Sequence, residues 1–429
     1  MTSKIKQRIE QIRYGNVPAG YKKAKAGILP ADWDVHMLGD CLSRVEKPVE
    51  VKPNELYTQI GIRSHGKGLF YKEPVTGAAL GNKAVFWIEP DCFIVNIVFA
   101  WEQAIGKTTQ SEVGMIGSHR FPMYRPVNDR VDIDYLISYF LTKRGTDILE
   151  AASPGGAGRN KTLGQDRFLK SKIVLPPIED QQKIAAILTT QDRVIELKEK
   201  RLAEKQRQKK YLMQQLLTGK KRLPGFSGEW KSVIMGEIGA TFSGLSSKSK
   251  EDFGQGKPYI PYINIYSNSI IDTQKLEYVR ISDEERQEKV KYGDIFFTTS
   301  SETPDEVGMS SVLLSGVDEV YLNSFCFGFR LYDFSVLLPV FAAQYFRGDA
   351  FRSIIKVLAQ GATRYNLSKN NLLKCRLSLP SIREQTAIAE ILSAADREID
   401  LLRQDIEQEK QKKKALMQLL LTGIVRVNA

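Results

Sequence analysis

The same long segment occurs twice in this chain, and this repeat constrains the fold more than any other feature. Residues 175–219 and 379–423 align without a gap, with an offset of 204 residues between Leu175 and Leu379. Both copies open with Leu-Pro and close with Leu-Met-Gln-x-Leu-Leu-Thr-Gly. A period this long is not that of a solenoid. It indicates a duplicated globular region, each copy followed by a duplicated connector.

Weaker matches extend the repeat upstream of each connector. Each half has Leu-Pro, then a tryptophan (Trp33 and Trp230), then a glycine, and a glycine-rich basic segment precedes each connector. The predicted order is therefore head, connector, head, connector. We expect an N-terminal segment over 1–28, a first head over 29–175, a first helical spacer over 176–222, a second head over 223–379 and a second helical spacer over 380–429.

Both connectors carry the signals of a long helix. Proline stands just before each predicted start, and Gly219 and Gly423 stand just after each predicted end, where glycine commonly terminates a helix. The side chains that follow alternating steps of four and three form a coiled-coil seam. The seam positions are Ile184, Leu188, Gln191, Ile195, Lys198, Leu202, Lys205, Lys209, Leu212 and Leu216 in the first copy, and Ile388, Leu392, Ala395, Ile399, Leu402, Ile406, Glu409, Lys413, Leu416 and Leu420 in the second.

Two such seams in one chain predict that the helices pair with each other, in an antiparallel sense and with a pseudo-two-fold relation. Separate helices would each expose a long apolar stripe. The alternative is that each helix packs on a partner protein instead. The polar middle of the first seam (Lys198, Lys205 and Lys209) weakens the local core and favours one register.

The two heads are predicted to be mixed α/β. Strand-like runs cover 56–62, 84–88, 93–100, 259–266 and 293–299, and a helix-like run follows in each head, at 133–149 and 337–355. The expected fold class is thus α+β, with two mixed α/β heads joined by two long antiparallel coiled-coil helices as a pseudo-two-fold internal repeat.

Composition narrows the class of partner and the compartment. Lysine and arginine number 62 against 50 acidic residues, a net charge of +12, which favours a polyanion and nucleic acid first. No apolar run approaches 18 residues, and the charged N-terminus is not a secretory signal. The four cysteines are scattered without a CxxC pair, which argues against a zinc site or a disulfide scaffold and suits a reducing cytoplasm.

Sequence motifs of catalysis are missing. The chain has no HExxH, GxSxG or GxGxxG, no Asn-Pro-Pro-Tyr or Asn-Pro-Pro-Phe run, and its three histidines are too scattered for a metal cluster. The glycine and lysine spacing of "GIRSHGKG", residues 61–68, is similar to that of a phosphate-binding P-loop. However, Lys67 is followed by Gly68, where a Ser or Thr would ligate magnesium, and a strand and turn are predicted next, where a helix is required.

The complete pattern resembles the specificity subunit of type I restriction-modification enzymes. A fixed order of motifs occurs twice over essentially the whole chain. It consists of Leu-Pro followed by a tryptophan (Leu-Pro-x-x-Trp in the first copy), a variable head, Leu-Pro-x-Ile-x-x-Gln, a long helix and Leu-Met-Gln-x-Leu-Leu-Thr-Gly. The resemblance implies that the heads are target recognition domains, each reading one half of a split DNA sequence. It also implies that helix length sets the gap between the halves, and that residues 1–28 pack near the C-terminal helix end.

The resemblance further implies a chain without catalytic activity, metal or cofactor of its own. It would recruit two methyltransferase subunits, which use S-adenosylmethionine to methylate adenine. Restriction subunits would join to form an ATP-dependent endonuclease, so that ATP and Mg²⁺ belong to partner subunits. Two alternatives stay open: the recognition subunit of a related combined nuclease-methyltransferase, and a coiled-coil protein-interaction scaffold.

Candidate DNA contacts are basic, amide, hydroxyl or aromatic side chains on glycine-rich turns of the heads, because such groups bind phosphates and base edges. Two segments in each head qualify, and each has a plain solvated turn as its alternative. The glycine-basic segments recur in both heads, which favours a shared role at the DNA backbone. The candidates are Arg63, Ser64, His65, Lys67, Arg159, Asn160 and Lys161 in the first head, and Ser267, Asn268, Arg364, Tyr365 and Asn366 in the second.

Overall fold

A computed structural model describes residues 3–24, 27–155, 161–359, 361 and 364–427. The chain divides into two compact units. Unit 1 consists of residues 1–198 and 405–429, and unit 2 of residues 199–404. Each unit therefore contains one head together with parts of both long helices. The predicted domain boundaries differ from this division, which cuts through the helices, and they stay predictions.

The head of unit 1 is built around a four-stranded antiparallel sheet in the order β11-β10-β13-β4. Helices α4, α5 and α6 supply core side chains, and Phe93, Tyr124, Phe140 and Phe168 form an aromatic cluster that is fully buried. The elements are α1 (Ser3–Arg13), β1 (Tyr21–Ala24), β2 (Gly27–Pro30), β3 (Asp34–Met37), α2 (Leu38–Cys41), β4 (Leu42–Val45), β5 (Leu56–Tyr57), β6 (Ile60–Ile62), β7 (Leu69–Tyr71), β8 (Val75–Thr76), α3 (Gly77–Leu80), β9 (Val85–Trp87), β10 (Phe93–Val95), η1 (Ala100–Glu102), β11 (Ile105–Lys107), η2 (Gln110–Glu112), β12 (Ile116–Ser118), β13 (Met123–Pro126), α4 (Ile133–Phe140), α5 (Lys143–Ala151), α6 (Gln165–Leu169) and β14 (Lys172–Leu175).

The head of unit 2 has the same sheet plan, in the order β21-β19-β23-β16. Phe297 on β19 lies at the centre of an aromatic cluster with Phe327, Phe346 and Phe351. The elements are β15 (Lys231–Ile234), α8 (Met235–Ile238), β16 (Gly239–Ser243), η3 (Lys250–Asp252), β17 (Phe253–Ile260), α9 (Tyr262–Ser267), β18 (Glu277–Val279), β19 (Ile295–Thr298), β20 (Ser300–Ser301), β21 (Ser310–Val312), β22 (Tyr321–Leu322), β23 (Cys326–Leu331), α10 (Pro339–Tyr345), α11 (Asp349–Leu358), β24 (Tyr365–Asn366), α12 (Lys369–Leu373) and β25 (Arg376–Leu379).

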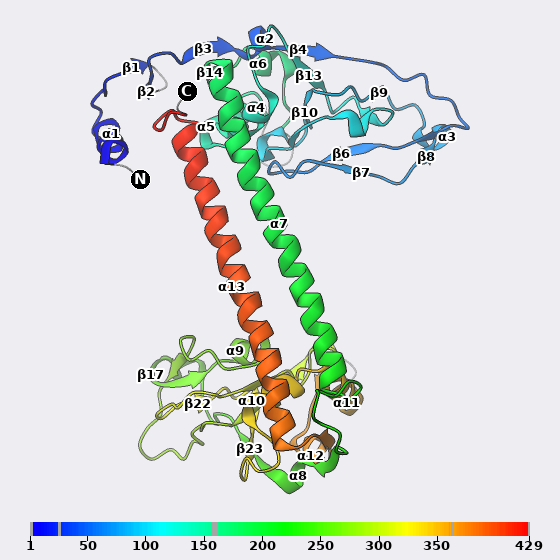
Figure 1. Ribbon diagram of the computed structural model, residues 1–429, viewed down its shortest axis with the longest axis vertical. Coiled ribbons are helices and arrows are strands. Elements are labelled where there is room, and N and C mark those ends of the chain that lie inside the picture. The colour runs from blue at the N-terminus through cyan, green and yellow to red at the C-terminus, as the bar shows by residue number, and fades with distance from the viewer. Residues whose placement is uncertain (1–2, 25–26, 156–160, 360, 362–363, 428–429) are drawn as a thin grey trace. The chain divides into compact units, whose positions relative to one another are not determined.

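The two connectors are helices of 39 residues each, α7 (Ile178–Leu216) and α13 (Ile382–Leu420). Within each unit they pack side by side and run in opposite directions (Figure 1). Every predicted seam position is buried or half-buried, which confirms the seam. In the part of the chain that the structure describes, no helix is long and apolar enough to cross a membrane.

Charged pairs flank the seam and repeat with the sequence. Lys413 binds Asp192 at 2.6 Å in unit 1, and Lys209 binds Asp396 at 2.5 Å in unit 2, so the two pairs are related by the 204-residue offset. Other pairs nearer the middle lack a counterpart at the 204-residue offset among the ion pairs described here. In these, Lys198 of α7 binds Asp405 and Glu409 of α13, and Lys205 of α7 binds Glu398 of α13.

Reversing the charge of Lys198 is expected to weaken the helix pair in unit 1. Its ammonium lies 2.8 Å from carboxylate oxygens of both Asp405 and Glu409, so Lys198→Glu would replace two attractions by two repulsions. We expect a lower denaturant midpoint, and recovery of most of the loss in the triple variant Lys198→Glu, Asp405→Lys, Glu409→Lys. An unchanged midpoint for the single variant would show that these pairs do not stabilise the helices.

The glutamine of the Leu-Pro-x-Ile-x-x-Gln motif is a buried clamp in both units. Gln181 accepts a hydrogen bond from the Asp132 amide at 2.9 Å and donates to the carbonyl oxygens of Arg130 and Pro176, both at 2.9 Å. Gln385 accepts from Leu338 at 2.9 Å and donates to Val336 at 2.8 Å and Pro380 at 3.0 Å. The glutamine thus fixes the start of each long helix to the loop that precedes α4 or α10.

The closing glycine of each repeat packs on a tryptophan. Gly219 and Gly423 have φ of 70° and 72°, where glycine is favoured. A Cβ at Gly219 would lie 3.3 Å from the Trp230 ring, and one at Gly423 would lie 3.3 Å from the Trp33 ring. The residue three positions further on binds the first turn of the other long helix. These contacts are Arg222 with Glu384 in unit 2 and Arg426 with Asp180 in unit 1.

The N-terminal segment contacts the end of α13 within unit 1. The Arg8 guanidinium donates to the Ile424 carbonyl at 3.2 Å, and the Tyr21 hydroxyl donates to the Gly423 carbonyl at 2.7 Å. Arg8 also lies over the Tyr21 ring, 5.4 Å from its centroid. The segment is therefore tied to the last turn of the second repeat.

Three predictions about local structure were wrong. The run 259–266 is not one strand: β17 ends at Ile260, and α9 begins after Pro261, which cannot donate to a strand ladder. The helix-like runs are each two helices, because Thr142 caps α5 and Gly348 precedes α11. The run 56–62 is broken into β5 and β6, which pair with different strands.

Candidate nucleic-acid interface

The turn that follows β6 is a hairpin, not a phosphate-binding loop. Ile62 pairs with Leu69 at its base, and the chain continues into β7 where a P-loop would begin a helix. His65 and Gly66 have φ of 61° and 63°. A Cβ at Gly66 would come within 2.5 Å of the Leu141 side chain, which would have to shift, and the positive φ also favours glycine here. The rejection of the P-loop on sequence grounds is confirmed.

The tip of this hairpin is held against the 3₁₀ helix η1. The Ser64 hydroxyl donates to the Glu102 carboxylate at 2.9 Å, and the His65 amide donates to the Glu102 carbonyl at 2.8 Å. The Gly66 amide donates to the Gln103 carbonyl at 2.9 Å. The turn is therefore rigid, and the Ser64 hydroxyl already has a partner inside the protein.

The basic side chains of this turn differ in how many contacts they make within the protein. Arg63 donates to the Leu69 carbonyl at 2.6 Å and lies over the Phe70 ring, 5.0 Å from its centroid, which leaves part of its guanidinium available. His65 and Lys67 are exposed, and Lys67 has no hydrogen bond or ion pair with any described residue. Lys67 is thus the side chain of this turn best placed to contact a phosphate.

Lys161, the described candidate of the glycine-basic segment in unit 1, lies at the same 3₁₀ helix as the hairpin. The Lys161 ammonium lies 5.3 Å from the centroid of the Trp101 ring and 2.7 Å from a Glu150 carboxylate oxygen. Arg159 and Asn160, the other two candidates of this segment, lie outside the described residues. The structure therefore brings Lys161 and the 63–67 turn together around η1, although they are far apart in sequence.

In unit 2 the first predicted segment lies at the end of α9. Ser267 is exposed, whereas the Asn268 side chain donates to the Asn264 backbone and side-chain oxygens, both at 3.0 Å. Arg347 donates to the Asn268 carbonyl at 2.7 Å. Asn268 is consequently a structural residue whose amide is engaged, and only Ser267 of this pair presents a free side chain among the described contacts.

The second segment of unit 2 borders a cavity. Tyr365 and Asn366 form β24, which pairs with β20. The cavity is about 390 Å³ and includes Arg364 in its wall; the other lining residues are Tyr262, Ser300, Ser301, Glu302, Glu306 and Phe325. Arg364 is exposed, and its guanidinium has no hydrogen-bond partner among the described residues. This cavity combines a cation, carboxylates, hydroxyls and aromatic rings.

One backbone hydrogen bond recurs at equivalent places in the two heads, just after each glycine-basic segment. The Leu163 amide donates to Ile97 at 2.8 Å in unit 1, and the Leu367 amide donates to Thr299 at 2.9 Å in unit 2. Leu163 and Leu367 are related by the 204-residue offset. In both heads, therefore, the residue just after the glycine-basic segment bonds to the chain that leaves the second strand of the four-stranded sheet.

Besides Arg364, the two exposed residues of the cavity wall were not among the predicted contacts. Phe325 lies in the turn between β22 and β23 and is 65% exposed, and Glu302 follows β20. No sequence signal distinguishes Phe325 from the core phenylalanines on either side of it, because only the turn geometry directs it outward. Glu302 stands in a polar run that is typical of a solvated loop.

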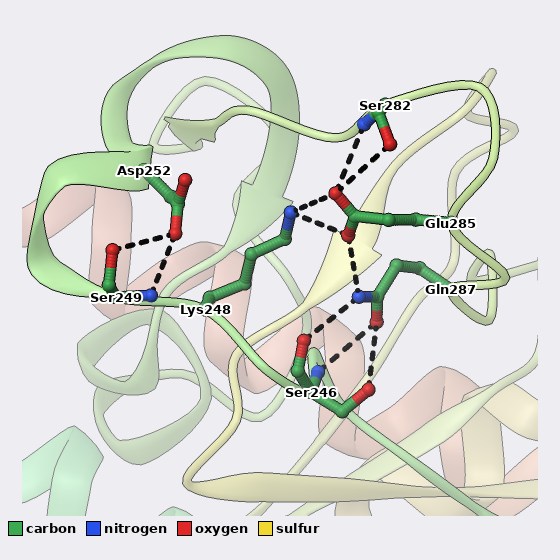
Figure 2. A network of polar contacts seen from close by, with 7 residues as sticks. All are labelled: Ser246, Lys248, Ser249, Asp252, Ser282, Glu285 and Gln287. Carbon is green, nitrogen blue, oxygen red and sulfur yellow. Dashed lines mark hydrogen bonds and ion pairs between the residues drawn. The ribbon is translucent and has the colours of Figure 1, made fainter.

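A separate polar network in unit 2 is structural. Lys248 is bound by Glu285, and its side chain is only 5% exposed. Glu285 also accepts from the Ser282 amide at 3.2 Å and from Gln287 at 3.0 Å (Figure 2). Gln287 in turn donates to the Ser246 carbonyl at 2.9 Å. The loop before η3 is thereby fixed to the segment after β18, and Lys248 is not available to DNA.

This network predicts a pH dependence of stability. Its hydrogen bonds, first of all that from Lys248, lower the pKa of Glu285 to about 2 from an ordinary value of 4.5. The contribution of the carboxylate is therefore complete above about pH 4.5 and is lost as the pH falls towards 2. We expect Glu285→Gln to lower the thermal midpoint of unfolding at pH 7, and the difference from the unaltered protein to vanish near pH 2. A difference that is constant with pH would contradict this.

Across the described residues, no three His, Cys, Asp or Glu side chains are grouped so as to hold a metal ion. The four cysteines are buried and free. The chemistry of the surfaces described above is instead that of binding, with exposed cations and hydroxyls beside aromatic rings on rigid turns.

Comparison with known proteins identifies the family. The family model of the type I restriction modification DNA specificity domain matches residues 88–206 and 227–411, one segment in each repeat. The chain belongs to the family of type I restriction-modification specificity subunits. Among its relatives is the MjaX protein of Methanocaldococcus jannaschii, provisionally named as such a subunit. It is 26% identical over 442 residues, which cover 95% of this chain and 97% of that protein.

Solved structures of specificity subunits share the fold. The HsdS subunit from Thermoanaerobacter tengcongensis has a TM-score of 0.51 and 17% identity, over 92% of this chain and 98% of that one. A chain from a study of complex assembly and conformational transition of the type I restriction-modification system has a TM-score of 0.59 and 17% identity, over 92% and 99%. The specificity subunit described here is therefore a DNA-binding protein with two target recognition domains and the predicted α+β fold.

Proposed function

We propose that this specificity subunit reads a split DNA target, one half-site per unit. The proposal rests on one observation: both units of the chain share the same framework. They have the same order of four strands, the same buried glutamine clamp and the same contact between a closing glycine and a tryptophan. A protein with two similar recognition units is suited to a target with two half-sites, because the spacing of half-sites reflects the geometry of the protein that reads them.

The proposal includes the partners. The subunit recruits two methyltransferase subunits that methylate adenine with S-adenosylmethionine, and restriction subunits that use ATP and Mg²⁺, while this chain itself performs no catalysis. Support comes from membership of the family and from the likeness to a chain studied for assembly of the type I system. Family membership also favours this function over a coiled-coil scaffold and over a combined nuclease-methyltransferase.

Binding by the assembled complex is expected to weaken steeply with salt. The chain carries a net charge of +12, and cations such as Lys67 are free to neutralise phosphates. Each neutralised phosphate contributes about −0.9 to the slope of log binding constant against log salt concentration. Titrating a target duplex with the complex at several salt concentrations measures this slope, and an affinity independent of salt would argue against a DNA interface.

Sequencing of methylated bases in strains with and without this chain tests the function. The expected result is an adenine-methylated motif of two short halves around an unspecified spacer, present only when the chain is expressed with its methyltransferase partner. Complementation with the intact gene should restore the same motif. If deletion changes no methylated motif while the methyltransferase is active, the proposed function is wrong.

A further inference from the structure

The cavity beside β20 in unit 2 has the groups required to read one base pair. It is lined by a cation and a carboxylate, Arg364 and Glu302, that have no hydrogen-bond or ion-pair partner among the described residues, and by a second carboxylate, Glu306, that is engaged. Glu306 accepts from the Tyr266 hydroxyl at 2.7 Å and from the Ser301 hydroxyl at 3.2 Å. Of the two acids, Glu302 is therefore the one that can bind a ligand.

The walls of the cavity are fixed before any ligand binds. The Tyr262 and Tyr266 rings stack with centroids 6.0 Å apart, and the Tyr262 hydroxyl donates to the Ser300 carbonyl at 3.3 Å. On the rim, the Phe325 amide donates to Asn323 at 2.8 Å, and the Phe325 carbonyl accepts from Thr299 at 3.0 Å. The exposed Phe325 ring is thus held in place by its backbone, where it can shield the polar contacts from water.

The position of Arg364 is also constrained by the backbone. Tyr365 and Asn366, which follow it, pair with Ser301 and Ser300 of β20. Gly361 has a φ of 140°, and a Cβ there would lie 1.9 Å from the Arg364 carbonyl oxygen, so only glycine fits at position 361. The backbone of Arg364 is consequently held by the strand that follows it and by this close approach to Gly361, which is the kind of support that base reading requires and that a mobile phosphate contact does not.

We propose that Arg364 and Glu302 read one G·C base pair of the half-site bound by unit 2. In the major groove guanine offers two adjacent acceptors, O6 and N7, which match the two parallel N–H groups of a guanidinium, and cytosine offers the N4 donor, which a carboxylate accepts. An arginine and an unpaired carboxylate in one cavity are the complement of that pair. The inference rests on the proposed function, and it gives Arg364 a role in specificity in place of the backbone contact expected from sequence.

The test uses the complete complex with its methyltransferase partners and a panel of duplexes in which each base pair of the wild-type motif is changed in turn. Arg364→Ala is expected to lose roughly 5- to 150-fold of discrimination at a single G·C pair, the range for one good bidentate contact. Glu302→Gln should relax the preference at that same pair. Arg286→Ala and Glu284→Gln, exposed residues of the same unit, are the matched controls and should leave the preference profile unchanged.

Each other outcome overturns the inference while the proposed function stands. These outcomes are an unchanged profile, relaxation at an A·T pair, relaxation at two different pairs by the two variants, and a weakening that is uniform over all sequences, which indicates a phosphate contact. Arg364→Lys is the control for misfolding. Lysine keeps the positive charge but lacks the two parallel N–H groups of the guanidinium, so this variant should retain DNA affinity and lose discrimination at the G·C pair. A wild-type complex with no preference at any position would overturn the proposed function, and this inference with it.

Discussion

Replacing Arg347 by methionine is expected to lower the free energy of unfolding of unit 2 by about 3–5 kcal/mol. The guanidinium donates to four backbone carbonyls, those of Ser310, Ile265, Tyr266 and Asn268, at distances of 2.6, 2.6, 3.0 and 2.7 Å. Burial lowers the pKa of Arg347 to about 10, so the group is charged at neutral pH. Each hydrogen bond from a charged donor is worth about 1.5–3 kcal/mol, and such contributions are less than additive.

The loss should also affect the proposed DNA-binding surface, because Arg347 holds the end of α9, where the candidate contact Ser267 is exposed. Denaturant unfolding measures the stability, and duplex binding by the complex measures recognition of each half-site. Arg286→Met, at an exposed position of the same unit, is the control and should leave both unchanged. If Arg347→Met cost less than about 1 kcal/mol, the typical value of one hydrogen bond, these four bonds could not be what holds α9.

Replacing Gln385 by leucine is expected to cost about 2–4 kcal/mol, since three backbone groups lose their partner at a site that is 0% exposed. Leucine keeps a similar size, so the effect reports hydrogen bonding more than volume. The same change at Gln181 in unit 1 should cost a similar amount, because its three hydrogen bonds are equivalent.

The two substitutions therefore serve as controls for each other. In a chemical unfolding experiment, Gln181→Leu should shift only the transition of unit 1, and Gln385→Leu should shift only the transition of unit 2. Replacing Gln208, which is exposed on α7, should shift neither. A large loss from only one of the two glutamines would mean that the motif does not have the same structural role in both repeats.

The repeat and the seam could be predicted because they depend on periodicity and local signals. Residues spaced by three and four must share a face of a helix, and proline and glycine mark its ends. The position of the seam in α7 and α13 is accordingly confirmed residue by residue. The specific partners of Lys198 or Gln181, in contrast, depend on which segments the fold brings together, and no local pattern contains that information.

The heads were harder to predict because tertiary contacts overrule local preference. The β-branched and aromatic residues of 259–266 favour a strand, yet buried Asn264 bonds to Asp272 and Lys275 and fixes a helix there. Among the candidate contacts, Ser64 and Asn268 prove to be engaged internally, as the hydrogen bonds to Glu102 and Asn264 show. Sequence indicates which groups can bind DNA, but not which of them the protein itself occupies.

DNA binding by the complete complex can show whether one unit reads one half of a split target. Four duplexes suffice: the methylated motif intact, the first half changed, the second half changed, and only the spacer sequence changed. Either changed half should weaken binding, the spacer sequence should have no effect, and Arg364→Ala in unit 2 should reduce the penalty for one half alone. Equal reduction for both halves, or a contiguous site without a spacer, would contradict this assignment of one half to each unit.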